Sequence, residues 1–318
     1  MKSSFFITFI FTILLTVGIN AFNVTISDRD MKNYLAVENI KRDIPFNGER
    51  LLDVYYDKTN VKQKKRVVVH IFGSSWVNGD KIGQTKIGSL LEREGYVAVV
   101  PNYVLFPNGT IDDMVEDVYK AIQWTYKNIS KYGGNPKKIY VCAHSSGAHI
   151  TSLAIIKSTL HLKNNGVALK SLPKLKRVIF LNGPFSIDAE FLAYTLQGTG
   201  DASNATVTSD PEQQAVLQQL MMKFYGDKSV SPTELLKDCE KNSITNKFNV
   251  NKFVFLYTSD DIVIPESSAK NLISEIMRTS SSSFEYIYEE GLGHATITDG
   301  VRAGLFEYEE WYMDLIRA

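Results

Sequence analysis

Two adjacent serines, Ser145 and Ser146, stand where a predicted strand runs directly into a predicted helix, in the sequence YVCAHSSGAHI. A serine on such a turn can act as a nucleophile, and the usual pattern around it is G-x-S-x-G. The turn is tight, so the residues two before and two after the nucleophile must be small. For Ser145 these flanking residues are Ala143 and Gly147, whereas for Ser146 the preceding one is His144, which would clash. The spacing therefore favours Ser145 as the nucleophile, and the alternative role for this serine is a helix cap.

An acid and a base follow the serine along the chain, each after its own predicted strand. The segment LYTSDDIVIP places Asp260 and Asp261 on a loop after one strand, and EEGLGHATI places His294 after the last strand. A nucleophilic serine needs an imidazole that takes its proton and a carboxylate that orients the imidazole. Asp is common in strand-to-helix turns for purely structural reasons. The order serine, aspartate, histidine nevertheless favours catalysis, because it is the chain order of triads in this kind of sheet.

The loop FGSSWVNGDK comes directly after the apolar strand VVVHIF, where such folds place donors for an oxyanion. Gly73 lets the backbone approach a substrate carbonyl closely. The expected donors are the amides of Gly73 or Ser74, together with the amide of Ser146 at a helix N-terminus. Trp76 is expected to anchor the loop. This chemistry needs no cofactor, and no Cys-x-x-Cys pair or His/Cys cluster suggests a metal site.

These residues need a scaffold that brings the ends of several strands together. Strand-like and helix-like segments alternate along the chain, which predicts a parallel sheet flanked by helices. The predicted fold class is therefore α/β, with a mostly parallel central sheet and helices on its faces. We expect one domain over residues 40–318, with an inserted cap at about 185–249. Particular expectations are an edge strand in LLDVYYD, a helix capped by Thr110 and a final helix over about 299–316.

Charge and the N-terminal segment bear on partners and location. Lys+Arg and Asp+Glu both number 35, so the net charge is zero, which argues against a nucleic-acid partner. Residues 1–21 have a basic start, an apolar stretch and small or polar residues, which predicts a signal peptide and the secretory pathway (endoplasmic reticulum, Golgi or secretion). An uncleaved anchor that associates with the membrane is the alternative. Four N-glycosylation sequons suit that route, at Asn23, Asn108, Asn128 and Asn204.

From about Leu51 onward the chain resembles α/β-hydrolase esterases of the prenylcysteine α-carboxyl methylesterase group, near the kynurenine formamidases and the hormone-sensitive-lipase-like esterases. The similarity is densest in FGSSWVNGDK, in the stretch from FPNGTIDDMVEDV to HSSGAHI, and in SDDIVIP with the later GLGH. The resemblance implies an α/β-hydrolase fold with Ser145 as nucleophile, His294 as base and Asp261 as acid. Asp261 is preferred over Asp260 because the acid of the family stands just before an Ile-Pro pair. The chain departs from the family pattern at Ala143, at the pair Ser74-Ser75 and at Val104.

The resemblance also implies a reaction, which is the hydrolysis of carboxylic esters and in particular of prenylcysteine methyl esters. The substrate would be a small-molecule ester with an isoprenoid tail, and the apolar residues 215–224 of the cap would form a wall for that tail or simply pack on the sheet. An arylformamidase or a general short-chain carboxylesterase is the alternative within the enzyme class. An inactive binding or adhesion protein with the same fold is the alternative of another class.

Overall fold

The computed structural model describes residues 26–73, 75–188, 190–191, 194 and 230–317 of the 318-residue chain. The predictions for residues 1–21, Asn23, Ser74 and Asn204 lie outside the described residues, as does segment 215–224. The division into one domain with a cap at 185–249 stays a prediction, since most of that cap is also outside them. Within the described ranges, no helix combines the length and the apolar character needed to cross a membrane.

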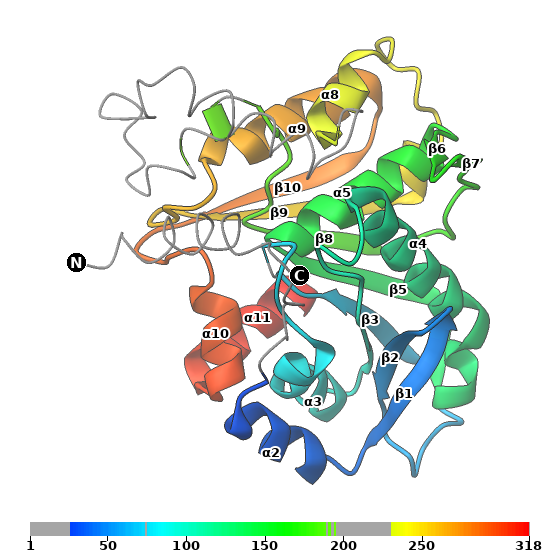
Figure 1. Ribbon diagram of the computed structural model, residues 1–318, viewed down its shortest axis with the longest axis vertical. Helices are drawn as coiled ribbons and strands as arrows, with labels where there is room; N and C mark the ends of the chain where they lie inside the picture. Colours follow the sequence, from blue (N-terminus) through cyan, green and yellow to red (C-terminus); the bar gives the residue numbers. More distant parts are fainter. Residues whose placement is uncertain (1–25, 74, 189, 192–193, 195–229, 318) are drawn as a thin grey trace.

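A central sheet of eight strands runs through the described part of the molecule, in the order β1-β2-β4-β3-β5-β8-β9-β10 (Figure 1). From β4 to β10 every neighbouring pair is parallel, whereas β2 runs antiparallel to both of its neighbours, β1 and β4. The prediction of a mostly parallel sheet is therefore confirmed. The strands are β1 (Ile40–Asn47), β2 (Arg50–Tyr55), β3 (Lys65–Ile71), β4 (Val97–Pro101), β5 (Gly134–His144), β8 (Arg177–Leu181), β9 (Lys252–Thr258) and β10 (Ser283–Glu289).

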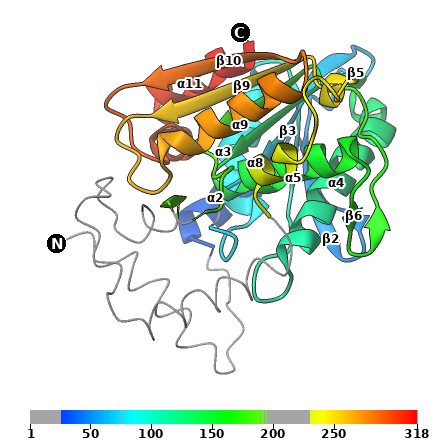
Figure 2. The same ribbon diagram turned by 90° about the horizontal axis from the view of Figure 1, so that it is seen from above.

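Helices cover both faces of this sheet, as the turned view in Figure 2 also shows. Along β3, Val67 and Val69 belong to the core on one face and Val68 to the core on the other, and all three are fully buried. A strand buried on both faces needs a continuous apolar run, which is what VVVHI supplies. The helical segments are α2 (Asp28–Ala36), η1 (Lys81–Gln84), α3 (Thr85–Arg93), α4 (Ile111–Asn128), η2 (Ile129–Tyr132), α5 (Ser146–Thr159), α8 (Pro232–Lys237), η4 (Lys247–Asn249), α9 (Glu266–Thr279), α10 (Thr296–Ala303) and α11 (Phe306–Arg317), and a short hairpin pairs β6 (Lys163–Asn164) with β7 (Val167–Ala168).

Helix α4 begins as predicted, because the Thr110 hydroxyl accepts from the Asp113 amide and the Asp113 carboxylate accepts from the Thr110 amide. Two other predictions are wrong. LLDVYYD is not the edge strand, since β1 pairs with the outer side of β2. The final helix is two helices, because Gly304 takes a left-handed conformation at φ +75° and ends α10 before α11 starts.

Candidate active site

Ser145 occupies the sharp turn between β5 and α5. Its backbone lies at φ 52° and ψ −126°, a region that residues with a side chain seldom adopt. The Ser145 amide donates to the Leu181 carbonyl of β8 at 2.9 Å, and the Ser145 carbonyl accepts from the His149 amide at 3.1 Å. The Ser145 side chain makes no capping hydrogen bond to α5, so the helix-cap interpretation of this serine is wrong.

Two glycines let other backbone segments pass close to this turn. A Cβ on Gly147 would lie 2.5 Å from the Phe72 carbonyl oxygen, so a larger residue would push α5 away from the end of β3. A Cβ on Gly73 would lie 2.7 Å from the Ser145 Cβ, so the backbone of the β3 loop packs directly against Ser145. The predicted need for a small residue two positions after Ser145 therefore has a steric reason, which is the close approach of the Phe72 carbonyl to Gly147.

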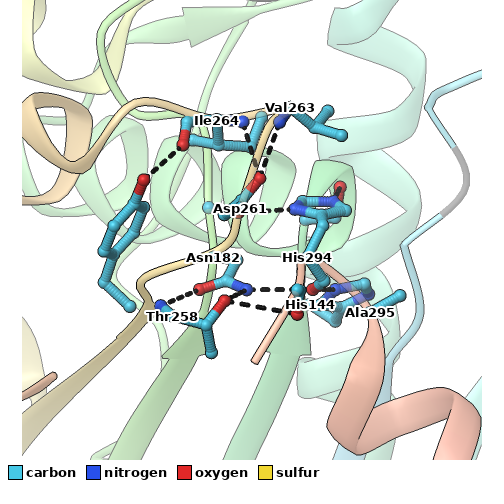
Figure 3. Close-up of polar contacts among 12 residues, drawn as sticks. His144, Asn182, Thr258, Asp261, Val263, Ile264, His294 and Ala295 are labelled. Atoms are coloured by element: carbon cyan, nitrogen blue, oxygen red, sulfur yellow. Dashed lines mark hydrogen bonds and ion pairs between the residues drawn. The ribbon is translucent and has the colours of Figure 1, made fainter. Parts of the chain in front are cut away.

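His294 lies on the loop after β10 and contacts both Ser145 and Asp261. Its Nε2 is 2.8 Å from the Ser145 Oγ, and its Nδ1 is 2.7 Å from the Asp261 Oδ2. Figure 3 shows the imidazole and the Asp261 carboxylate facing each other. A carboxylate can only accept, so Nδ1 carries the proton and Nε2 is left to accept from the serine hydroxyl.

The two neighbouring aspartates differ completely in their surroundings. Asp261 is 1% exposed, and its Oδ1 accepts from the amides of Val263 at 2.8 Å and Ile264 at 2.9 Å. Asp260 is exposed and its carboxylate accepts from the Ser259 hydroxyl. Of the two candidates left by the residue pattern, Asp261 is therefore the one that contacts the imidazole.

The loop after β3 is fastened at Trp76, as expected. The Trp76 Nε1 donates to the His149 Nδ1 at 3.1 Å, and the Trp76 carbonyl accepts from the Phe106 amide at 2.9 Å. Ser75 and Trp76 both have positive φ values, of 50° and 64°, which bends the loop sharply. Gly73 thus adjoins Ser145, and Ser146 is the first residue of α5.

Several polar residues around the site were not predicted. The Tyr103 hydroxyl donates to the Phe72 carbonyl at 3.0 Å, and the buried Asp117 carboxylate accepts from the Val104 amide at 2.8 Å. These contacts hold the segments after β3 and β4 near Ser145. The sequence could have indicated a buried role for Asp117, because this carboxylate interrupts the apolar face of α4 beside Val118.

His144, which the residue pattern marked only as a bulky neighbour, is buried beside the imidazole of His294, with 5.0 Å between the ring centroids. Burial lowers the pKa of His144 to about 3 and that of His149 to about 4, so both rings are neutral near pH 7. Among the described residues, no group of three His, Cys, Asp or Glu side chains lies close enough to hold a metal ion.

Known proteins share this sequence pattern and fold. An isoprenylcysteine alpha-carbonyl methylesterase of Arabidopsis thaliana is 30% identical over 158 residues, which are 49% of this chain and 36% of that protein. A second, probable methylesterase of this name from the same plant is 25% identical over 296 residues, which are 90% of this chain and 64% of that protein. The chain thus spans between about a third and two thirds of the length of these relatives.

Esterase B from Lactobacillus Rhamnosis has a similar structure, with a TM-score of 0.65 and 14% identity over 99% of this chain and 94% of that one. The BD-FAE family model matches residues 52–270, which is more than half of the chain. The protein therefore belongs to the BD-FAE family and has the α/β-hydrolase fold.

Proposed function

We propose that the protein is a serine carboxylic ester hydrolase. The observation that carries this proposal is the continuous chain of hydrogen bonds from Ser145 through His294 to Asp261, at 2.8 and 2.7 Å. The conformation of Ser145 at the end of a central parallel strand adds support, because it is the place where such folds hold a nucleophile. Relatives named as methylesterases support the same reaction class.

In the proposed reaction the Ser145 Oγ attacks the ester carbonyl carbon while its proton passes to the His294 Nε2. The Asp261 carboxylate stabilises the imidazolium that forms. The carbonyl oxygen becomes an oxyanion, which accepts hydrogen bonds from the amides of Gly73 or Ser74 and of Ser146. The carbon–oxygen bond to the alcohol then breaks, and His294 returns its proton to the leaving oxygen. Water repeats the sequence on the acyl-enzyme and releases the carboxylic acid.

The surroundings of the three side chains support this sequence of proton transfers. Asp261 is buried and already holds two backbone hydrogen bonds, so its position is fixed before a substrate arrives. Burial keeps the nearby His144 and His149 neutral by lowering the pKa of each, and His294 is the imidazole that contacts the Ser145 hydroxyl. Because Gly73 carries no side chain, its backbone, with the amide proposed as an oxyanion donor, packs directly against Ser145.

For the substrate, we propose a prenylcysteine methyl ester, which would release methanol. The support is the similarity to relatives named as isoprenylcysteine alpha-carbonyl methylesterases. If the chain enters the secretory pathway, Ser145 faces the lumen while prenylated proteins face the cytosol. A free, membrane-permeable prenylcysteine methyl ester would reach both compartments and fits this arrangement.

A fluorophosphonate probe tests the reaction class, since it phosphonylates an activated serine. We expect the purified wild-type protein to be labelled and Ser145→Ala to be unlabelled. Ser146→Ala is the matched control, because the adjacent serine contributes its amide and not its hydroxyl, and it should keep most of the labelling. Labelling that persists in Ser145→Ala would exclude Ser145 as the nucleophile. A folded wild type without any labelling would support the inactive binding protein instead.

A comparison of substrates tests the finer assignment. Rates with farnesylcysteine methyl ester are compared with those for an N-formyl arylamine and for p-nitrophenyl esters of increasing chain length. The prenylcysteine assignment requires the highest kcat/KM for the farnesyl compound. Equal turnover of farnesylcysteine methyl ester and p-nitrophenyl acetate would point to a general esterase, and preference for the formyl compound to an arylformamidase.

We also propose that the chain enters the secretory pathway and is glycosylated at Asn108. Asn108 is exposed, and its side chain makes no hydrogen bond to the described residues. Asn128 instead donates to the Trp124 carbonyl at 3.0 Å and accepts from the Lys131 ammonium at 3.1 Å, so its amide is part of the end of α4. After expression in a secreting eukaryotic cell, Asn108→Gln should remove one glycan and Asn128→Gln none. Sequencing of the mature N-terminus distinguishes cleavage near Ala21 from a retained anchor.

A further inference from the structure

The backbone carbonyl of His294 is held by two side chains from different strands. The His144 Nε2 donates to this oxygen at 2.9 Å, and the Asn182 Nδ2 donates to it at 2.9 Å (Figure 3). His144 ends β5, one residue before Ser145, and Asn182 directly follows β8. Both contacts act on the main chain of His294 and leave its imidazole to Ser145 and Asp261.

Asn182 is itself fixed in one orientation. Its Oδ1 accepts from the Thr258 amide at 3.1 Å, and its Nδ2 also donates to the Thr258 hydroxyl at 2.7 Å. Turning the side-chain amide over would place two oxygens against each other at the His294 carbonyl. The residue is 3% exposed, and its backbone has a φ of 46°, a conformation that asparagine tolerates better than most residues. β8 and β9 together therefore determine where this donor points.

His144 is held between the two loops that flank Ser145. A Cβ on Gly73 would lie 2.7 Å from the His144 Nδ1, so the ring packs against the Gly73 backbone on one side. On the other side, the ring meets the His294 carbonyl and lies 5.0 Å from the His294 ring. Because the ring is neutral, its single proton must sit on Nε2 to make the bond to the carbonyl. A neutral neighbour also avoids repulsion when His294 becomes charged.

We propose that His144 and Asn182 are positioning residues, which set the 2.8 Å distance between the His294 Nε2 and the Ser145 Oγ by holding the His294 carbonyl. This proposal rests on the proposed esterase function. A misplacement of about 1 Å at a reacting group can lower a rate about 100-fold. The expected effect is therefore on kcat, because neither residue is assigned a contact with the substrate.

Three substitutions separate the hydrogen bond from the volume of the side chains. His144→Phe keeps a ring of similar size but loses the donor, and His144→Gln keeps an N–H donor. Asn182→Ala removes the second donor. We expect His144→Phe and Asn182→Ala each to lower kcat on a p-nitrophenyl ester by about 10- to 100-fold, with KM within twofold of the wild type. His144→Gln should recover most of the rate that His144→Phe loses.

Two buried residues away from the site serve as matched controls. His70 is a buried histidine whose ring contacts the Tyr312 hydroxyl at 3.0 Å, and Asn164 is a buried asparagine that donates to the Asp112 carbonyl at 2.7 Å. His70→Phe and Asn164→Ala should lower the melting temperature as much as the site variants do. Their kcat should stay within twofold of the wild type, since neither bond reaches His294.

The outcomes distinguish the two proposals. A wild type that neither hydrolyses esters nor reacts with a fluorophosphonate would overturn the esterase and the positioning role together. An active wild type whose His144→Phe and Asn182→Ala variants keep a normal kcat would overturn only the positioning role. The positioning role is also overturned if KM rises at constant kcat, if the loss matches that of the control variants, or if His144→Gln is as slow as His144→Phe.

Discussion

Replacing Asp261 by asparagine should switch the tautomer of His294. The substitution keeps the size of the side chain, and its oxygen can still accept from the amides of Val263 and Ile264. In that orientation the new NH2 group faces the His294 Nδ1, which must then accept. The imidazole proton is forced onto Nε2. The Nε2 atom then faces the Ser145 hydroxyl as a donor and can no longer accept the serine proton.

The structure also indicates which orientation the new amide would adopt. The reverse orientation would restore the reactive tautomer but would break both backbone bonds to Asp261 Oδ1. Each unsatisfied buried donor costs about 1–3 kcal/mol, so the unreactive orientation is favoured by about 2–6 kcal/mol. Where the same substitution has been made in a serine triad, kcat falls by about 10⁴, which is about 5.4 kcal/mol of transition-state stabilisation. We expect a loss of that size for Asp261→Asn.

The assay compares Asp261→Asn with Asp260→Asn, measuring kcat on a p-nitrophenyl ester, the rate of fluorophosphonate labelling and the melting temperature. Asp260 is exposed, and among the side chains that the structure describes its carboxylate accepts a hydrogen bond only from the Ser259 hydroxyl, so its substitution should change kcat less than twofold. The melting temperature of Asp261→Asn should fall by only a few degrees. The reasoning is refuted if Asp261→Asn keeps more than a tenth of the wild-type kcat, or if Asp260→Asn is the slower variant.

Three further outcomes are expected. Gly147→Ala should abolish fluorophosphonate labelling and lower the melting temperature, because the added methyl group would lie 2.5 Å from the Phe72 carbonyl oxygen. A variant that is labelled and stable would show instead that α5 can shift to make room. Asp53→Asn should lower the free energy of unfolding by about 1.5–3 kcal/mol in denaturant titrations, because the buried Lys81 ammonium loses the Asp53 carboxylate at 2.9 Å and keeps the Asp43 carboxylate at 2.8 Å. An unchanged stability would mean that Asp43 alone is sufficient to hold the ammonium. Burial lowers the pKa of His70 to about 4, so the neutral ring stabilises the fold above its unfolded pKa of about 6.5, and this stability is lost as the pH falls towards 4. His70→Gln should therefore flatten the acid side of the stability curve by up to about 1.4 kcal/mol per pH unit, and an unchanged slope would contradict it.

The central strands could be predicted because their burial on both faces leaves a plain sequence signal. β3 and β4 read as continuous apolar runs, and every residue from Val97 to Val100 is fully buried. Strand β1 was not predicted, because an edge strand does not have to be buried on both faces. Its sequence IKRDIPFN carries charges and a proline, and Asp43 bends it at φ 56°. The break at Gly304 was missed because a single glycine is compatible with one helix or two.

At the site, residue types and order were sufficient to choose Ser145 and His294 as candidates, since steric fit at a turn depends on near neighbours in the chain. The residues alone could not separate Asp260 from Asp261, because the choice depends on how the loop folds back so that the Val263 and Ile264 amides point at one carboxylate. The sequence marked His144 only by its bulk. Its contact with the His294 carbonyl joins positions 150 apart in the chain, and no local pattern encodes such a distance.

The wide separation of Ser145 and His294, 149 positions apart, makes the reactive serine a reporter of folding. The parallel strands that precede these two residues pair only after long segments of chain have been brought together, and such pairings are among the slower events in folding. During synthesis, the nucleophile emerges well before its base, so a nascent or partly folded chain would remain inert towards esters. The fraction of molecules that a fluorophosphonate labels would then count those in which the last strand has docked, which gives a chemical measure of refolding that needs no spectroscopic signal.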